Sequence, residues 1–267
     1  MKYCLDFKLN LPYMDKIDEF AIRYEDQKKE LLTFLETYPN HKINIEVTQD
    51  IDEKQLDFFN TLYMQFPHIC LKVNRGVGYH SVYELLRDKA TIPFFYDTRV
   101  DDWDTLRGLS RLGVSEMYIC GDLGFELDEV SKYLHERNIK IRAFPNVCQS
   151  AWTYDMEFLR SFFIRPEDVD VYDKYIDVFE FFGNEEAQKT IFKAYAIDKQ
   201  WYGKLEELII GFKGDMDSRY IFPLFADKRA VCKKKCVKGG KCNICGRLEE
   251  LASTLEEKHF MIKLDKK

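Results

Sequence analysis

The chain has 267 residues, of which 46% are hydrophobic and 32% are charged, so it can build a large core under a solvated surface. Its formal net charge of −6 excludes a protein that binds nucleic acid over its whole surface. No run approaches the roughly 20 apolar residues of a membrane-spanning helix, and no secretory signal follows Met1. We therefore expect a cytoplasmic protein with reduced cysteines and no membrane partner.

Short apolar runs alternate with amphipathic helical patterns along the first two thirds of the chain. Repeated strand–helix units predict parallel strands joined by right-handed crossovers. We predict nine strands for the eight positions of a barrel, so that one of the first two is an extra strand or one of the last two is an edge strand. The predicted strands are Tyr3–Leu9, Asp18–Tyr24, Lys42–Val47, His68–Val73, Thr91–Tyr96, Glu116–Cys120, Ile139–Phe144, Phe158–Ile164 and Asp177–Phe181.

The fold class that this order favours is an α/β protein with a (β/α)8 TIM-like barrel. An open dinucleotide-binding sheet is disfavoured because no glycine-rich phosphate fingerprint follows the first strand. The apolar periodicity changes after Gly183. We therefore predict a barrel over residues 1–183 and a helical extension over residues 184–267 that docks on it. The predicted barrel helices are Glu25–Tyr38, Asp52–Phe66, Ser81–Asp88, Asp102–Leu112 and Leu127–Asn138.

The extension contains four cysteines within 14 residues, Cys232, Cys236, Cys242 and Cys245, with glycines between and after them. Converging thiols on a turning loop are typical of a four-thiolate metal site. We favour zinc over a [4Fe-4S] cluster, because a closed set of four protein ligands suits structural zinc, although thiolates bind both. The alternatives are two disulfides, which need an oxidising compartment, or unpaired surface thiols.

The same loop is strongly basic: residues 228–247 hold eight lysines and arginines and no carboxylate. These cations can neutralise a metal–thiolate centre. They can also bind the phosphates of RNA or DNA, in which case Lys233, Lys234 and Lys235 would contact the substrate.

Polar residues follow the predicted strands, and parallel barrels carry their chemistry at the carboxyl ends of the strands. Each of these residues can instead be a helix cap or a loop ion pair. Cys148 follows a strand where a helix begins, and a thiol there can have a lowered pKa, although it can equally be a buried filler. Arginines among carboxylates suit an anionic substrate. The predicted catalytic residues are Cys148, Arg165, Asp97 and Glu46, and the predicted substrate-binding residues in the barrel are Arg75, Arg99, Asn146 and Glu180.

The segment Leu112–Trp152 contains Leu-Gly-Val-Ser-Glu-Met-Tyr-Ile, Glu-Leu-Asp-Glu-Val-Ser-Lys-Tyr-Leu-His and Asn-Ile-Lys-Ile-Arg-Ala-Phe-Pro-Asn. With the late strands, it resembles peptidase family U thirty-two, the collagenase-like peptidases, over residues 40–183. The resemblance implies a barrel and, for several members, an iron–sulfur cluster that serves oxygen insertion into RNA bases or quinone precursors. The family's cluster cysteines are widely spread, whereas these four are compressed, so no catalytic residue is carried over. The chain is also similar to uncharacterised barrel proteins of phage and low-GC bacteria.

Three functions are compatible with these features. The first is an RNA- or nucleotide-directed modifying enzyme with a metal–thiolate loop. The second is a non-catalytic barrel whose structural zinc knuckle binds nucleic acid or protein. The third is a catalytically inactive barrel kept for assembly, such as a phage or host-interaction component. Peptidase activity is not expected, because the sequence has no His-Glu-x-x-His and no recognisable nucleophile–His–acid set.

Overall fold

The computed structural model describes residues 2–6, 13–27, 30–74, 79–147, 162–212, 217–221 and 225–233. The chain divides into two compact units. The first, the barrel unit, comprises Met1–Ile119, Ser131–Ala143 and Ile176–Glu180. The second unit comprises Cys120–Val130, Phe144–Tyr175 and Phe181–Lys267.

The barrel unit is built on one sheet in which all the strand pairs are parallel, in the order β5-β4-β3-β2-β1-β9-β8-β7-β6. The strands are β1 Lys2–Asp6, β2 Glu19–Arg23, β3 Lys42–Val47, β4 Ile69–Asn74, β5 Phe94–Asp97, β6 Arg99–Val100, β7 Glu116–Ile119, β8 Lys140–Ala143 and β9 Val178–Glu180. Every second residue of these strands is apolar and faces outward, for example Phe20, Ile43 and Ile45, and these side chains are buried.

The sheet is a nearly closed barrel because its two end strands are parts of one chain segment. Only Thr98 separates β5 from β6, and β5 pairs with β4 whereas β6 pairs with β7. The amide of Ser115, just before β7, donates a 2.8 Å hydrogen bond to the carbonyl of Phe94. Counting β5 and β6 as one position gives the eight positions of a (β/α) barrel, so the predicted α/β barrel class is confirmed.

The surplus among the nine predicted strands is the one expected at Phe158–Ile164. Its residues 162–164 form neither helix nor strand, and its earlier residues lie outside the described ranges. Both of the first two predicted strands are barrel strands, β1 and β2.

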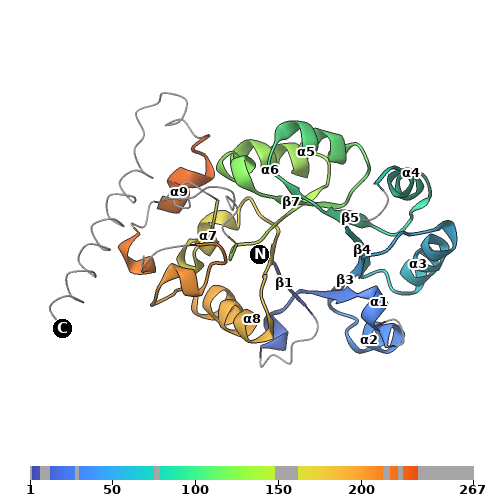
Figure 1. Ribbon diagram of the computed structural model, residues 1–267, viewed down its shortest axis with the longest axis horizontal. Helices are drawn as coiled ribbons and strands as arrows, with labels where there is room; N and C mark the ends of the chain where they lie inside the picture. Colours follow the sequence, from blue (N-terminus) through green and yellow to red (C-terminus); the bar gives the residue numbers. More distant parts are fainter. Residues whose placement is uncertain are drawn as a thin grey trace. The chain divides into compact units, whose positions relative to one another are not determined.

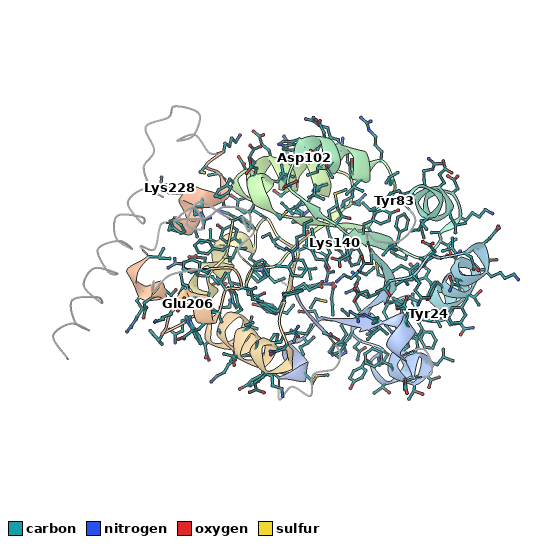
Figure 2. The ribbon with its side chains drawn as sticks, in the orientation of Figure 1. Tyr24, Tyr83, Asp102, Lys140, Glu206 and Lys228 are labelled. Carbon is teal, nitrogen blue, oxygen red and sulfur yellow. The ribbon has the colours of Figure 1, made fainter. Side chains whose placement is uncertain are left out.

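Helices cover the outer side of the barrel strands, as Figure 1 shows for α3, α4 and α5. Helix α3 begins after Asp52, whose carboxylate accepts a 2.7 Å hydrogen bond from the Gln55 amide in a capping box. Tyr83 on α4 and Asp102 at the start of α5 lie in this outer layer (Figure 2). The helices are α1 Tyr24–Gln27, α2 Leu31–Thr37, α3 Glu53–Gln65, α4 Tyr79–Lys89, α5 Trp103–Ser110 and α6 Leu127–His135, with a 3-10 turn, η1, at Met14–Lys16.

The second unit is made of short helices and loops. The described residues of its predicted extension are helical in part, whereas residues 234–267, with most of the cysteine loop, lie outside the described ranges. The predicted boundary at residue 183 stays a prediction. The elements of the second unit are η2 Gly121–Phe125, η4 Pro166–Asp168, α7 Val169–Tyr172, α8 Glu185–Phe192, the π-helix η5 Lys193–Asp198, η6 Leu205–Glu207, η7 Ser218–Tyr220 and α9 Phe225–Ala230.

Candidate functional site

The interior of the barrel is polar, unlike the layers of branched apolar side chains that usually fill this fold. Alternation along each strand sends every second side chain inward. The strand registers pair inward residues with one another, for example Glu19 with Lys42 and Glu46 with Lys72. The inward residues of the central layers are Cys4, Glu19, Ala21, Lys42, Asn44, Cys70, Lys72, Phe95, Glu116, Tyr118, Arg142, Val178 and Glu180.

Arg142 lies at the centre of this interior and is fully buried. Its Nη1 donates to Glu19 at 2.8 Å and to Glu116 at 2.5 Å, and its Nη2 donates to Glu180 at 2.9 Å. The guanidinium also lies over the ring of Phe95, 5.0 Å from its centroid. One cation therefore binds carboxylates from three strands, β2, β7 and β9.

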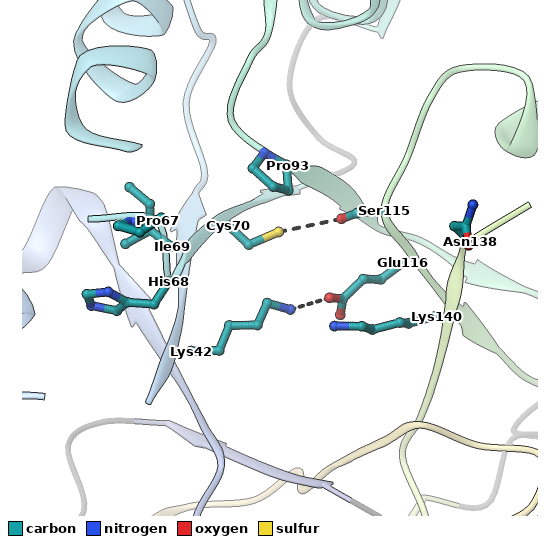
Figure 3. Close-up of a pocket in the computed structure, with 10 residues that line it drawn as sticks. All are labelled: Lys42, Pro67, His68, Ile69, Cys70, Pro93, Ser115, Glu116, Asn138 and Lys140. Atoms are coloured by element: carbon teal, nitrogen blue, oxygen red, sulfur yellow. Dashed lines mark hydrogen bonds and ion pairs between the residues drawn. The ribbon is translucent and has the colours of Figure 1, made fainter. Parts of the chain in front are cut away.

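At the amino ends of the strands, Lys42 pairs with Glu116 and lies 3.5 Å from Glu19. Figure 3 shows Lys42 and Lys140 reaching toward Glu116 from opposite sides of a pocket of about 310 Å³. Burial raises the pKa of the Cys70 thiol to about 11, despite the opposing effect of Lys42, so this thiol is protonated at neutral pH. The pocket is lined by Lys42, Pro67, His68, Ile69, Cys70, Pro93, Ser115, Glu116, Asn138 and Lys140.

At the carboxyl ends, Lys72 is held by Glu180. The Lys72 Nζ donates to Glu180 Oε1 at 2.8 Å, and the Tyr118 hydroxyl donates to Glu180 Oε2 at 2.6 Å. Asp97 lies 4.0 Å from the Lys72 ammonium. Glu46, on β3, is the register neighbour of Lys72, on β4. We call these five residues the carboxyl-end cluster.

Charge pairing separates the carboxylates of the barrel into two groups. Lys42, Lys72 and Arg142 balance Glu19, Glu116 and Glu180, each through the contacts given above. Glu46 and Asp97 lie at the carboxyl ends of β3 and β5. Asp97 shares Lys72 with Glu180 at 4.0 Å, and Lys72 and Arg23 act electrostatically on Glu46. This is the end at which barrel enzymes carry their chemistry.

The protonation equilibria follow the same division. Burial opposes ionisation of Glu19 and Glu180, but nearby cations outweigh it. Arg142 and Lys42 lower the pKa of Glu19 to about 2, and Lys72 and Arg142 lower the pKa of Glu180 to about 2. Burial would likewise lower the pKa of Lys72, yet Glu180 raises it well above the usual value. Glu46 moves the other way: burial, aided by Asp97 and opposed by Lys72, raises its pKa. Glu46 is therefore a carboxyl group that protonates more readily than an ordinary glutamate.

The structure brings some of the predicted site residues together. Glu46, Asp97 and Glu180 belong to the carboxyl-end cluster, and exposed Arg99 begins β6 beside them in sequence. Arg99 is in register with Tyr118 of β7.

Arg165 and Asn146 belong to the second unit, where both bind protein groups. Arg165 is paired with Asp168 through two hydrogen bonds of 2.6 Å, and its Nη1 donates to the carbonyls of Ser218 and Ile221. The side-chain amide of buried Asn146 exchanges hydrogen bonds of 2.6 and 3.0 Å with the backbone of Phe182. Both side chains clamp the loops of this unit together, and their predicted catalytic and binding roles stay predictions.

Several predicted site residues lie outside the described ranges: Arg75, Cys148, Lys234, Lys235, Cys236, Cys242 and Cys245. Cys232 and Lys233 are described, and Lys233 forms an ion pair with Glu129. Among the residues that the structure describes, no three His, Cys, Asp or Glu side chains form a group that could hold a metal ion. The described part of the chain also contains no helix long and apolar enough to cross a membrane.

The sequence analysis did not single out Arg142, Lys72, Tyr118, Glu19 or Glu116. Each stands inside a predicted strand or at its edge, between apolar neighbours. A charged residue on the inner side of a barrel strand is an uncommon pattern, because burying an unpaired charge is costly. Charged residues at the inward positions of these strands were therefore the sequence feature that could have predicted the polar interior.

The fold and the interior define an α/β barrel protein with a charged lumen. No protein-family model matches the chain, and a search of curated proteins finds no match.

Proposed function

We propose that this protein is a barrel enzyme that transfers protons on a polar substrate at the carboxyl-end cluster. The observation that carries the proposal is the placement of Glu46, a carboxyl group of raised pKa, beside Lys72 in the strand register, where Lys72 is an ammonium group that stays charged. Catalytic acids and bases need a pKa near the working pH, and burial moves Glu46 in that direction.

Each residue of the cluster has a distinct role in this proposal. Glu46 accepts or returns a proton. Lys72 stabilises negative charge that develops on a substrate oxygen, because a preorganised cation is effective where water is excluded. Glu180 and Tyr118 position the ammonium, and burial, aided by Asp97, keeps the pKa of Glu46 high. The cluster can therefore act as a base and an oxyanion stabiliser on the same molecule.

The substrate class that we propose is RNA or a nucleotide. The support is the run of eight basic residues within 228–247, together with Arg75 and Arg99 at strand ends. Phosphates bind lysine and arginine strongly, and the interaction weakens as salt concentration rises. Lys233, Lys234 and Lys235 would bind the phosphates, and Cys148 is the proposed nucleophile.

The proposed cofactor is a metal bound by Cys232, Cys236, Cys242 and Cys245, zinc in preference to a [4Fe-4S] cluster. The fit rests on the soft, converging thiol donors of the sequence. A zinc ion would fold the loop, and a cluster would add electron transfer.

The test is incubation of the oxygen-free purified protein with total RNA and with a panel of nucleotides, read by mass spectrometry of the nucleosides. We expect conversion that Glu46→Gln and Lys72→Met each reduce at least 100-fold, in the range of general acid–base catalysis. Asp15→Asn, at an exposed side chain, is the control that retains conversion. Full conversion by Glu46→Gln would exclude the cluster as the site.

The alternative is a non-catalytic barrel that binds nucleic acid or protein. The observation that favours it is the pairing of Lys42, Lys72 and Arg142, which ties each of these cations to a carboxylate of the barrel itself, as in a scaffold. Retention of RNA that weakens with salt and on charge reversal of Lys233, Lys234 and Lys235, without conversion, would favour this alternative.

A further inference from the structure

The pocket at the amino ends of the barrel strands, drawn in Figure 3, has no part in the proposed reaction. Its volume of about 310 Å³ is at the lower end of the range for sites that bind small molecules. Lys42 and Lys140, which line it, begin β3 and β8, whereas Glu46 and Glu180 of the carboxyl-end cluster lie near or at the far ends of β3 and β9. The pocket is therefore separate from the site proposed for catalysis.

Three cations are directed to one carboxylate at this pocket. Glu116 Oε1 accepts a hydrogen bond from Lys42, and Glu116 Oε2 accepts one of 2.5 Å from Arg142. The exposed side chain of Lys140 reaches toward the same carboxylate from the other side (Figure 3). Because both oxygens of Glu116 already bind other cations, an anionic ligand can compete for the ammonium group of Lys140.

The charges that line the pocket suit a ligand with a single negative charge. Lys42 and Lys140 contribute two positive charges and Glu116 one negative charge. Burial lowers the pKa of His68, so its ring is neutral at pH 7, and burial raises the pKa of Cys70, so its thiol is neutral as well. A monoanion balances this excess of one positive charge, whereas a phosphate group, with a charge near −2, exceeds it and faces Glu116.

The other side of the pocket is apolar. Pro67 and Ile69 lie across the pocket from Lys140 (Figure 3), and Pro93 completes this side. Apolar surface that is removed from water stabilises a bound ligand. The side-chain amide of Asn138, which lines the pocket on the side of Lys140, can donate a second hydrogen bond to an anion. A planar carboxylate on an apolar body matches both sides of the pocket.

We infer that this pocket binds a small organic monocarboxylate. The carboxylate lies at Lys140 and Asn138, and the apolar part of the ligand lies against Pro67, Ile69 and Pro93. Barrel enzymes carry their chemistry at the other ends of the strands, so the ligand is bound here and not converted. The inference does not depend on the reaction proposed for the carboxyl-end cluster, because binding is measured without turnover.

The test titrates the full-length protein with benzoate, benzamide and phenyl phosphate, which share a ring and differ in charge. Dissociation constants are measured by NMR titration at pH 7. We expect benzoate to bind at least about tenfold more tightly than benzamide, as one charge-assisted hydrogen bond predicts, and more tightly than phenyl phosphate. Equal binding of benzoate and benzamide, no saturable binding of benzoate, or tighter binding of phenyl phosphate would each overturn the inference.

Substitutions then locate the bound carboxylate. Lys140→Met should weaken benzoate binding at least about tenfold and leave benzamide binding unchanged. Asn138→Gly should weaken benzoate binding severalfold without straining the backbone, because Asn138 has a φ of 58°, which glycine readily adopts. Lys132→Met, at an exposed side chain on α6, is the control and should bind benzoate as wild type does.

Thermal melting checks that each variant is folded. Unchanged benzoate binding by a folded Lys140→Met would show that the carboxylate binds elsewhere, and would overturn the inference. Equal weakening by Lys140→Met and Lys132→Met would show only a general effect of surface charge, and would overturn it as well.

Discussion

At the scale of single residues, Arg142 has the greatest influence on the barrel unit. It is fully buried and donates to Glu19, Glu116 and Glu180, which come from strands far apart in the sequence. A buried ion pair adds little stability compared with a well-packed apolar pair, but removing one partner leaves a charge without compensation. Loss of the Arg142 cation would leave three buried carboxylates without this partner, which is unfavourable.

We therefore expect Arg142→Met to lower the free energy of unfolding by about 3–5 kcal/mol. The measurement is denaturant unfolding at pH 7, followed by circular dichroism. Lys132→Met, at an exposed side chain on α6, is the control and should change the free energy by less than about 0.5 kcal/mol. Equal effects of the two substitutions on the free energy of unfolding would show that the ion pairs of Arg142 do not stabilise the fold.

At the scale of elements, the short helix η2 is packed more tightly than its length suggests. A Cβ atom on Gly124 would lie 2.4 Å from ring atoms of Phe162. That ring is itself buried and contacts the rings of Phe125 and Tyr172 at 6.3 and 5.9 Å between centroids, so it has little room to move. Glycine is required at this position because the element and the ring meet without a side chain between them.

Gly124→Ala should therefore destabilise the protein by about 1–3 kcal/mol, the usual cost of overpacking. Gly108 in α5 is the matched control: it is exposed, and a Cβ there would meet nothing within 4 Å. Gly108→Ala should stabilise by about 0.5–1 kcal/mol, because alanine restricts the unfolded chain and favours the helix. The measurement is the midpoint of denaturant unfolding, which should fall for Gly124→Ala and rise for Gly108→Ala. An unchanged midpoint for Gly124→Ala would contradict the packing argument.

At the scale of the whole molecule, the charged lumen makes stability depend on acid. The pKa of Glu19 and of Glu180 is about 2 in the folded protein, below the ordinary value of 4.5. Carboxyl groups of lowered pKa stabilise the fold above their ordinary pKa, and this contribution is lost as the pH falls toward the folded value.

We expect the free energy of unfolding to fall between about pH 4.5 and pH 2, by roughly 3 kcal/mol for each carboxyl group. Urea unfolding at a series of pH values measures the slope. Arg142→Met should show a shallower slope, because the cation that lowers both pKa values is missing. A wild-type free energy that stays constant from pH 5 to pH 2.5 would contradict the assigned ion pairs.

The sequence by itself determined the parallel α/β barrel and most of its strands. The signals are local: apolar runs of strand length, helical periodicity between them, and a cap such as Asp52 at a helix start. The polar residues at strand ends, Glu46, Asp97 and Glu180, were also visible as candidates for the same reason, since a strand end is a local property.

Only the tertiary structure decided which charges meet. Glu19 and Arg142 are separated by 123 residues along the chain, and they meet at 2.8 Å because the pairing of β1 with β9 brings their strands, β2 and β8, near each other. Strand alternation predicts that a side chain points inward, but not its partner across the lumen, because the partner depends on the register of every strand in between.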